Sequence, residues 1–513
     1  NKHAVATESN ALGRVITNSY NALGLVTNAS DGRVTNAYFY SGEGRLVAHW
    51  RNGELVATNQ YDAFGRLYWT RDAAGLETWR DYDGLNRLVS ETFDNNGQWS
   101  TNIIEYDCCS IDRIADRDGN MWDLQYNDIG ELVQAVNPVG LTNDNVYGIE
   151  RQPRSVSNAL HWTTRQYTPE GWIKSVAYPT DRTYDPNYHA ENFWYDGEGR
   201  LTKQQTVSGA YFRYGYDSMG RLLTAEVPDG SNLAFGVEQY VLAETNKYDA
   251  LGRKWWTQDI RGLVTSNTFN SLGQVLKTWY PDASTEEWSY NQWGQVLTYK
   301  DRAGNVASNF YDSQGRLWQQ IDARLSSIYL VYTNADLVSV ISNSAGQIWS
   351  FAYDAERRVR EIVHPDPAVV ESFAYSPMGA VTQHVVGNVV QTLSYDGLGG
   401  RTSVQVDGIV VESNRYDQLG RPIWQQDADG LIITNAWDSW GERMGSYGPG
   451  NQGESYQQGD RGLTNIADRL GIPTSILRDS LGRVAGAVDG ATNRVSYAYW
   501  SNGINQIQSL WDG

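Results

Sequence analysis

A short phrase that recurs along the chain decides the fold, and it first occurs in full as Tyr61-Asp62-Ala63-Phe64-Gly65-Arg66-Leu67. Its Tyr-Asp and Gly-Arg pairs are intact in six copies: Tyr61, Asp62, Gly65, Arg66, Tyr195, Asp196, Gly199, Arg200, Tyr216, Asp217, Gly220, Arg221, Tyr248, Asp249, Gly252, Arg253, Tyr311, Asp312, Gly315, Arg316, Tyr416, Asp417, Gly420 and Arg421. Worn copies continue the series, so that positions 248, 269, 290, 311, 332 and 353 follow one another at steps of 21 residues. A fixed period of this length is typical of a protein built from structural repeats.

A second turn signal lies about halfway through each repeat, 11 residues after the Tyr, as in Asp72-Ala73-Ala74-Gly75. The segments between turns, such as Leu431-Ile432-Ile433-Thr434, are too short for helices and rich in residues that favour strands. In Asp-x-x-Gly, the carboxylate can accept a hydrogen bond from the N–H two residues on, and the Gly can adopt the left-handed conformation. Each signal therefore predicts a hairpin. The repeated Asp is interpreted as a turn cap, and the repeated Arg as a partner of that Asp or of a ring in the neighbouring strand.

Consecutive hairpins predict an all-β fold, a long antiparallel meander of about 21-residue, two-strand repeats. Dividing 513 residues by 21 gives about 24 repeats and on the order of 48 strands. Because open sheets rarely exceed ~10 strands without curling, we expect the sheet to wind into a spiral or hollow β-shell. Residues 1–513 are interpreted as one continuous segment with irregular insertions near 178–190, 225–245 and 445–460. Neither end shows a capping repeat, so we expect a piece of a larger protein.

Composition and motifs argue against several classes of function. The chain has 41 Lys and Arg against 60 Asp and Glu, a net charge of −19, which disfavours binding to nucleic acid. No apolar run approaches the ~20 residues of a membrane span. The six His residues show no metal-ligand spacing, and no Gly-x-Ser-x-Gly elbow, phosphate-binding loop or dinucleotide fingerprint occurs. We therefore expect no catalytic residue, no cofactor, no metal and no enzyme activity.

The two cysteines, Cys108 and Cys109, are adjacent and occupy the variable positions of a Tyr-Asp-x-x turn. Adjacent cysteines cannot link distant parts of a fold, so disulfides do not support this structure. Two readings remain open for the pair. Reduced thiols at a turn are favoured, and a strained vicinal disulfide is the alternative.

Aromatic side chains are the best candidates for ligand binding, since the chain has 20 Trp, 33 Tyr and 10 Phe. Trp69, Trp256 and Trp424 fall eight residues after the Tyr of their repeats, and Trp318 falls seven after. Because strand residues alternate between two faces, this set is expected on both faces of the sheet. Rings on an outer face could stack on sugars. Packing against cross-strand neighbours is the preferred reading, because a thin sheet has few other ways to bury area.

Tyr-Asp-x-x-Gly-Arg-Leu at a spacing of about 21 residues resembles the YD-repeat, or Rhs, family, and the resemblance covers essentially the whole chain. It implies a long β-sheet that spirals into a hollow shell, as in bacterial Rhs toxins, the B and C components of insecticidal Tc toxins, and teneurins. In the bacterial members the shell encloses a toxic carboxy-terminal domain, and in teneurins it supports adhesion. The Arg-Tyr-Tyr-Asp-Pro phrase that closes Rhs cores is absent here; Tyr184-Asp185-Pro186 is a partial echo.

The resemblance implies a non-enzymatic shell or scaffold from a secreted or surface-displayed bacterial protein, which encapsulates or presents a toxin or other domain of the same polypeptide. The first alternative is a cell-surface adhesion or carbohydrate-binding repeat protein. The second is a repeat-built extracellular fibre. A container predicts a closed cavity, an adhesin predicts exposed Trp clusters with affinity for glycans, and a fibre predicts edge-to-edge pairing of the terminal repeats.

Overall fold

The structure is a computed structural model, and it describes most of the chain. The described residues are 6–11, 13–148, 151–158, 162–178, 190–207, 209–228, 240–438, 441–449, 453–459, 462–468, 470–478, 484–490, 494–499 and 507–512. The insertion predicted near 178–190 therefore lies almost entirely outside the described residues, and those near 225–245 and 445–460 lie outside them in part.

Every regular element of the described residues that exceeds a single turn is a β-strand, and there are 47 of them. The first 24 are β1 (Thr7–Ser9), β2 (Val15–Tyr20), β3 (Val26–Ser30), β4 (Thr35–Tyr40), β5 (Leu46–Arg51), β6 (Glu54–Tyr61), β7 (Leu67–Asp72), β8 (Glu77–Tyr82), β9 (Leu88–Asn95), β10 (Gln98–Tyr106), β11 (Ile111–Ala115), β12 (Met121–Tyr126), β13 (Leu132–Val136), β14 (Thr142–Tyr147), β15 (Pro153–Ser157), β16 (Trp162–Tyr167), β17 (Ile173–Ala177), β18 (Ala190–Tyr195), β19 (Leu201–Gln205), β20 (Tyr211–Tyr216), β21 (Leu222–Pro228), β22 (Tyr240–Tyr248), β23 (Lys254–Asp259) and β24 (Val264–Phe269).

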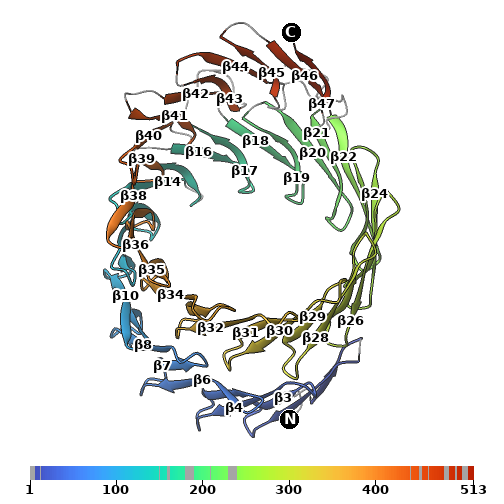
Figure 1. Cartoon of the computed structure of the whole chain (residues 1–513), viewed down its shortest axis with the longest axis vertical. Helices are drawn as coiled ribbons and strands as arrows, with labels where there is room; N and C mark the ends of the chain where they lie inside the picture. The colour runs from blue at the N-terminus through green and yellow to red at the C-terminus, as the bar shows by residue number, and fades with distance from the viewer. Residues whose placement is uncertain are drawn as a thin grey trace. The chain divides into compact units, whose positions relative to one another are not determined.

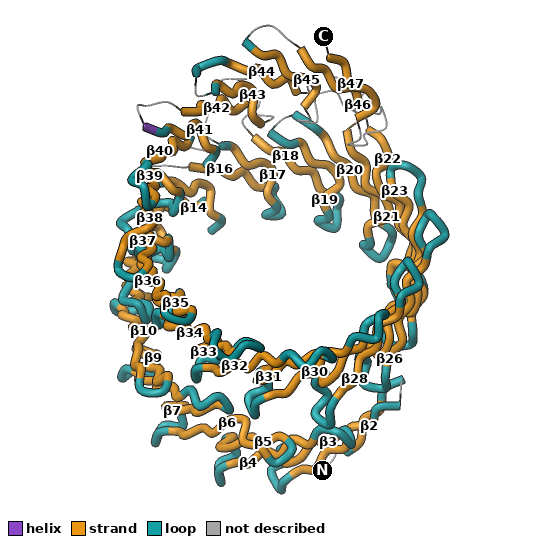
Figure 2. Tube along the Cα trace, in the orientation of Figure 1, coloured by secondary structure: helices purple, strands orange, loops and turns teal. Residues whose placement is uncertain are grey.

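The remaining strands are β25 (Val275–Trp279), β26 (Thr285–Tyr290), β27 (Val296–Lys300), β28 (Val306–Tyr311), β29 (Leu317–Ile321), β30 (Ser327–Tyr332), β31 (Val338–Asn343), β32 (Ile348–Tyr353), β33 (Val359–Val363), β34 (Val370–Tyr375), β35 (Val381–Val386), β36 (Val389–Tyr395), β37 (Arg401–Val406), β38 (Ile409–Tyr416), β39 (Pro422–Asp427), β40 (Ile432–Trp437), β41 (Arg443–Tyr447), β42 (Gly453–Gly459), β43 (Gly462–Ala467), β44 (Pro473–Arg478), β45 (Val484–Asp489), β46 (Arg494–Tyr499) and β47 (Ile507–Asp512). Figure 2 shows these short strands alternating with turns along the chain. The all-β prediction and the expected number of strands are confirmed.

Strands that follow one another in sequence pair in antiparallel fashion, as predicted for a meander. In β28 and β29, Phe310 lies opposite Gln319, whereas Tyr311 lies opposite Leu317. One extra residue, Trp318, is thus accommodated on β29, which makes a β-bulge directly before the Tyr. The same shift precedes the Tyr in other repeats, for example in the pairings of β6 with β7 and of β32 with β33.

The Tyr-Asp turn is a tight loop closed by two backbone hydrogen bonds. In the repeat of Tyr311, the Asp312 N–H donates to the Arg316 carbonyl at 2.9 Å, and the Gly315 N–H donates to the Asp312 carbonyl at 3.0 Å. Gly315 has φ of 85°, a left-handed conformation that costs little only for Gly. The sequence spacing of Asp and Gly is therefore the spacing that this backbone requires.

The chain divides into two compact units. Unit 1 contains Asn1–Met121, Asn267–Ser394 and Gln405–Ile409, and unit 2 contains Trp122–Ser266, Tyr395–Val404 and Val410–Gly513. Within unit 1, turns from the first segment contact turns from the second, such as those at Arg51 and Asp336, and Figure 1 shows β4 to β8 beside the later strands β28 to β32. The interpretation of residues 1–513 as a single continuous segment stays a prediction.

Little hydrocarbon is fully buried in this thin sheet. Leu141, Ala210 and Ala355 are the buried hydrophobic residues among those described, and no large side chain there is fully buried. Cross-strand pairs and polar contacts in the turns therefore contribute an unusually large share of the packing.

Candidate functional site

The repeated Tyr ties each repeat to the strand before it. The Tyr311 hydroxyl donates to the Val296 carbonyl at 2.8 Å, which spans 15 residues of sequence. Equivalent bonds of 2.6–3.1 Å are made by Tyr40, Tyr61, Tyr82, Tyr106, Tyr147, Tyr167, Tyr195, Tyr216, Tyr248, Tyr290, Tyr332, Tyr353, Tyr375 and Tyr416. Burial raises the pKa of Tyr311 above its ordinary value, so the hydroxyl keeps its proton and remains a donor at neutral pH.

The repeated Asp caps the turn with one oxygen and holds Arg with the other. Asp312 Oδ1 accepts from the N–H groups of Gln314 and Arg316, at 2.9 and 2.8 Å. Its Oδ2 accepts from Arg316 Nε at 2.8 Å. Burial alone would raise the pKa of Asp312, but the hydrogen bonds and the charge of Arg316 outweigh it and hold the pKa below its ordinary value. Asp312 is therefore a fixed anion of the turn.

The repeated Arg connects each turn to the next repeat. The Arg316 guanidinium lies over the Tyr332 ring, 4.7 Å from its centroid, and donates to the Thr333 carbonyl at 3.4 Å. The same stacking on the next aromatic ring is made by Arg66, Arg87, Arg200, Arg221, Arg358 and Arg421. We call this arrangement, exemplified by Asp312, Arg316 and Tyr332, the Asp–Arg–ring clamp. It couples each repeat to its neighbour through a charge-assisted bond and a cation–π contact.

The structure places the 24 predicted repeat residues in equivalent positions. Each Tyr is the last residue of a strand, and each Asp and Gly lie in the turn that follows. Each Arg is the residue directly before the next strand. In all six copies the Asp and the Arg form an i,i+4 ion pair, with N to O distances of 2.6–2.8 Å. These residues are spread over the sheet, one set per repeat, and do not converge on a single site.

One repeated residue is absent from the sequence prediction, an Asn two positions before the Tyr. Asn309 Nδ2 donates at 3.0 Å to the Val296 carbonyl, the same oxygen that Tyr311 binds. Asn59, Asn145, Asn246, Asn414 and Asn435 make the equivalent bond. Asn246 is only 2% exposed. The signal was available in the sequence as Asn-x-Tyr-Asp, so the motif extends two residues further toward the amino terminus than predicted.

The four candidate sugar-stacking tryptophans have different surroundings. Lys247 Nζ lies 4.1 Å from the Trp256 ring centroid, and the Arg415 guanidinium lies 4.7 Å from that of Trp424. Trp69 Nε1 donates to Glu77 at 3.1 Å, and Trp69 lies opposite Trp79 on the next strand. Each of these three tryptophans is thus already in contact with a side chain of this chain, a cation for Trp256 and Trp424 and a carboxylate for Trp69.

Trp318 differs from the other three because it is 40% exposed and belongs to a row of rings. Its centroid lies 6.5 Å from that of Phe310 and 6.2 Å from that of Tyr329. Phe310 is 42% exposed.

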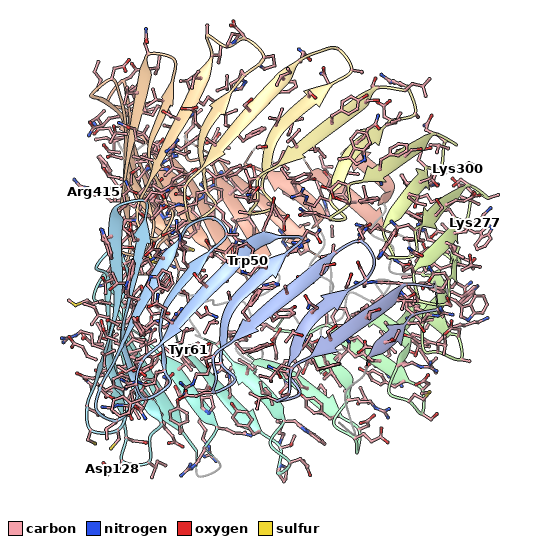
Figure 3. All side chains as sticks on the ribbon, turned by 90° about the horizontal axis from the view of Figure 1, so that it is seen from below. Trp50, Tyr61, Asp128, Lys277, Lys300 and Arg415 are labelled. Carbon is pink, nitrogen blue, oxygen red and sulfur yellow. The ribbon has the colours of Figure 1, made fainter. Side chains whose placement is uncertain are left out.

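Figure 3 shows the side chains spread over the sheet, with Trp50 and Tyr61 toward opposite ends of the β5–β6 hairpin.

Within unit 1, polar residues join strands that are more than 230 positions apart in sequence. Asn95 Nδ2 donates to Asp354 Oδ2 at 3.0 Å, and the N–H of the fully buried Ala355 donates to Asn95 Oδ1 at 2.7 Å. Arg117 Nη1 pairs with Glu356 Oε1 at 2.5 Å, with the side chains only 16% and 12% exposed. We call these five residues the joint of unit 1.

Unit 1 has further long-range contacts besides the joint, and unit 2 has a pair as well. Arg33 lies 4.3 Å from the Trp293 ring centroid and donates to Gln295 at 2.7 Å. In unit 2, Asn137 and Gln418 each donate from their side-chain amide to the backbone of the other turn, at 3.3 and 3.4 Å. The chain therefore returns beside its own earlier strands after roughly 240–285 residues, which accords with a winding sheet.

Two His residues share one carboxylate: His364, directly after β33, and His384, on β35, both contact Glu371 on β34. His364 Nε2 lies 2.7 Å from Glu371 Oε1, and His384 Nε2 lies 3.0 Å from Glu371 Oε2. These hydrogen bonds lower the pKa of Glu371 despite the opposing effect of burial. Phe373 stacks on His384 with centroids 4.6 Å apart. Among the described residues, no group of three or more His, Cys, Asp or Glu is arranged to hold a metal ion.

Cys108 and Cys109 are both exposed free thiols. A hydrogen bond with the Cys109 thiol, together with its charge, raises the pKa of Cys108, which lowers its thiolate fraction and its reactivity at neutral pH. In the part of the chain that the structure describes, no helix is long and apolar enough to cross a membrane.

Comparisons with known proteins agree with the repeat geometry. The model of the family described as RHS Repeat matches residues 195–231. The probable deoxyribonuclease RhsB of Dickeya dadantii (strain 3937) is 23% identical over 382 residues, which cover 71% of this chain and 23% of that protein. Double-stranded DNA deaminase toxin A of Burkholderia cenocepacia (strain H111) is 24% identical over 495 residues, which cover 78% of this chain and 33% of that protein. The chain thus spans about a quarter to a third of the length of these relatives.

Solved structures show the same fold at low sequence identity. The crystal structure of TcdB2-TccC3 has a TM-score of 0.56 and 12% identity, and the similarity covers 95% of this chain and 35% of that one. The Tc holotoxin pore of Photorhabdus luminescens has a TM-score of 0.53 and 12% identity, with coverage of 94% and 34%. At this level of identity, the comparison establishes a shared fold.

Proposed function

Because the chain belongs to the Rhs, or YD-repeat, family, we propose that it is a non-enzymatic β-scaffold that encloses or presents another domain of a larger bacterial toxin-related polypeptide. The observation that carries the proposal is the use of the repeat side chains. The Asp, Arg and Tyr of successive repeats serve the same clamp many times over. A catalytic group acts once in a site, whereas a structural contact recurs with the repeat.

The relatives support an association with a separate active domain. Their names describe a deoxyribonuclease and a DNA deaminase toxin, and this chain corresponds to only a quarter to a third of each. We assign those activities to other parts of such polypeptides, and a role as scaffold to this part. The partner is then a toxin domain of the same polypeptide, and the protein acts in a secreted or cell-surface location.

Limited proteolysis of the natural polypeptide that contains this chain tests the scaffold role. We expect the neighbouring domain to resist protease in the wild type and to become sensitive when Arg117→Met weakens the joint of unit 1. Arg357→Ala, which removes a more exposed pair with Asp72, is the matched control and should leave protection unchanged. Equal cleavage of the domain in all three proteins would contradict enclosure. Hydrolysis or deamination of double-stranded DNA by the isolated chain would contradict the non-enzymatic assignment.

Carbohydrate binding is a second candidate function, favoured by the row of Phe310, Trp318 and Tyr329, in which Phe310 and Trp318 are exposed. Flat exposed rings can stack on the apolar face of a sugar. We expect glycan-array binding by the wild-type chain that Trp318→Ala abolishes and Trp256→Ala preserves, because Lys247 already covers Trp256. Absence of binding in the wild type would remove this candidate, and adhesion with it. Fibre formation stays a prediction, which concentration-dependent assembly would reveal.

A further inference from the structure

A cavity formed by described residues of unit 1 lies at the turns after β29 and β31. It has a volume of about 650 Å³ and is lined by residues of β29 to β32 and of the intervening turns. Trp349, Phe351, Ile328 and Ile341 supply apolar walls, and Asp322 is the one charged residue in the lining. A cavity of this size with apolar walls and few polar groups is of the kind that binds small ligands or side chains.

The ring and the carboxylate of this cavity lack the partners that Trp256, Trp424 and Asp312 have. Asp322 Oδ1 caps its turn by accepting from the N–H groups of Arg324 and Ser326, both at 2.9 Å. Its Oδ2 accepts no hydrogen bond from any described residue, whereas Asp312 Oδ2 holds Arg316. The Trp349 ring likewise has no cation or second ring against it among the described residues, in contrast to Trp256 and Trp424.

The chain itself shows what an aromatic face and a nearby carboxylate bind. In every complete Asp–Arg–ring clamp the occupant is a guanidinium, which pairs with the Asp and lies 4.2–5.6 Å from the ring centroid. Arg is suited to this role because its planar fork donates to carboxylates and stacks on rings at the same time. The cavity therefore presents two parts of the clamp without the third.

Charge favours a cationic occupant over a neutral one. The lining carries a single negative charge, and the whole chain carries −19, so a basic partner gains from both short-range pairing and long-range attraction. Arg324, two residues after Asp322, is a local competitor. At the equivalent turn, Arg261 does fold back and pairs with Asp259 at 2.9 Å, whereas Arg324 makes no ion pair with any described residue.

We propose that the cavity lined by Asp322 and Trp349 is a docking site for an arginine side chain of a basic peptide segment in a protein partner. The guanidinium pairs with Asp322 Oδ2 and lies against the Trp349 ring, and Ile328 and Ile341 contact the aliphatic stem. This site is distinct from the exposed row at Trp318 and does not depend on the scaffold role.

The test uses Nα-acetyl-arginine methylamide as probe and its uncharged citrulline analogue as comparison, with dissociation constants measured by ligand-observed NMR on the full chain. We expect the arginine probe to bind about tenfold more tightly than citrulline, the size of a charge-assisted contact. Asp322→Asn and Trp349→Leu should each weaken it by about tenfold. Asn holds the same turn position at Asn343, where Oδ1 also accepts two N–H groups, so Asp322→Asn is expected to retain the fold.

Matched controls come from sites whose cation is already present. Asp259→Asn and Trp256→Leu should leave binding of the arginine probe unchanged, and Arg324→Ala should leave it unchanged or strengthen it by removing the local competitor. Equal affinity for citrulline, or equal affinity in wild type, Asp322→Asn and Trp349→Leu, would overturn the proposal. It would also be overturned if methyl glucoside bound in a Trp349-dependent manner and the arginine probe did not, since the cavity would then be a carbohydrate site.

Discussion

Arg316 contacts three neighbouring side chains, so its loss should affect two hairpins. Arg316 pairs with Asp312, covers the Tyr332 ring and also pairs with Asp336 at 2.9 Å. Arg316→Ala should therefore lower local stability by roughly 1–3 kcal/mol, measured as faster amide hydrogen exchange in β29 to β31. Arg316→Lys should recover only part, because an ammonium lacks the planar fork.

Arg324→Ala is the control for this substitution, because the Arg324 guanidinium makes no ion pair with a described residue. It should change stability by less than about 0.5 kcal/mol. If Arg316→Ala and Arg324→Ala gave the same exchange rates, the clamp would not contribute to stability.

Glu371 gives a residue-scale prediction about pH. Hydrogen bonds from His384 and His364 lower its pKa below the ordinary value of 4.5, in spite of burial. Because the folded-state pKa is the lower one, this carboxylate stabilises the fold above pH 4.5, and the contribution is lost as pH falls through the folded-state pKa. Glu371→Gln should therefore destabilise the protein at pH 6, and the loss should shrink as pH falls below 4.5, as measured by urea denaturation.

The control for the pH prediction is Glu43→Gln, since the Glu43 side chain is 69% exposed. Its effect should be small and nearly independent of pH. If Glu371→Gln lowered the free energy of unfolding as much at pH 3 as at pH 6, the contribution of Glu371 would come from its packing and not from its charge.

At the scale of the turn, two glycines with the same backbone conformation have different surroundings. Gly315 and Gly399 have φ of 85° and 83°. A Cβ at Gly315 would lie 2.5 Å from the Arg33 guanidinium, whereas a Cβ at Gly399 would meet nothing within 4 Å. Both Ala substitutions incur the left-handed penalty of roughly 1–2 kcal/mol, but Gly315→Ala must also displace Arg33 from Trp293.

We therefore expect Gly315→Ala to lower the midpoint of thermal unfolding further than Gly399→Ala does. Arg33→Ala should remove most of this difference when combined with Gly315→Ala, because the clash then disappears. A persistent difference in the Arg33→Ala background would mean that the cost at Gly315 arises from the turn itself.

The strands and turns were predictable because their signals are local. Asp and Gly at a fixed spacing mark the turn, and Tyr ends the strand, so the meander and its strand number follow from counting. The Asn at position 309 and its equivalents could have been found in the same way. The cations over Trp256 and Trp424 could not be found by counting alone, because Lys247 and Arg415 reach those rings through the cross-strand register.

At the scale of the whole molecule, each unit contains long-range polar contacts that no local sequence pattern predicts. Asn95 contacts Asp354, and Arg117 contacts Glu356, because later strands lie beside strands that are 239–259 residues earlier in the sequence. That distance depends on twist and curvature accumulated over many strands, which a repeat period does not specify. The cavity lined by Trp349 and Asp322 was likewise not predicted. Trp349 does not lie seven or eight residues after the Tyr of a repeat, where the other candidate tryptophans occur.

The joint of unit 1 makes a prediction at this scale. Arg117→Met leaves the largely buried Glu356 with Arg358 as its one remaining ion-pair partner among the described residues. Breaking one side of a buried pair typically costs about 3–5 kcal/mol. The double variant Arg117→Met/Glu356→Met should recover part of that loss. Hydrogen exchange in β9 to β11 and in β33 is the measurement, because both sides of the joint should loosen together.

Arg357→Ala is the comparison within the same unit. Arg357 and Asp72 are 49% and 32% exposed, so its effect should stay below about 1 kcal/mol. Loosening of only one side of the joint in Arg117→Met would contradict a mechanical link between the two segments.

The scarcity of buried hydrocarbon has a thermal consequence. The heat capacity change on unfolding grows with the apolar area that becomes exposed and is reduced by polar area. A sheet in which only Leu141, Ala210 and Ala355 are buried hydrophobic residues among those described, and in which polar clamps are repeated along the chain, should expose an unusually polar surface when it unfolds. The curve of its free energy of unfolding against temperature should therefore be broad and flat. Cooling or moderate heating should change that free energy little.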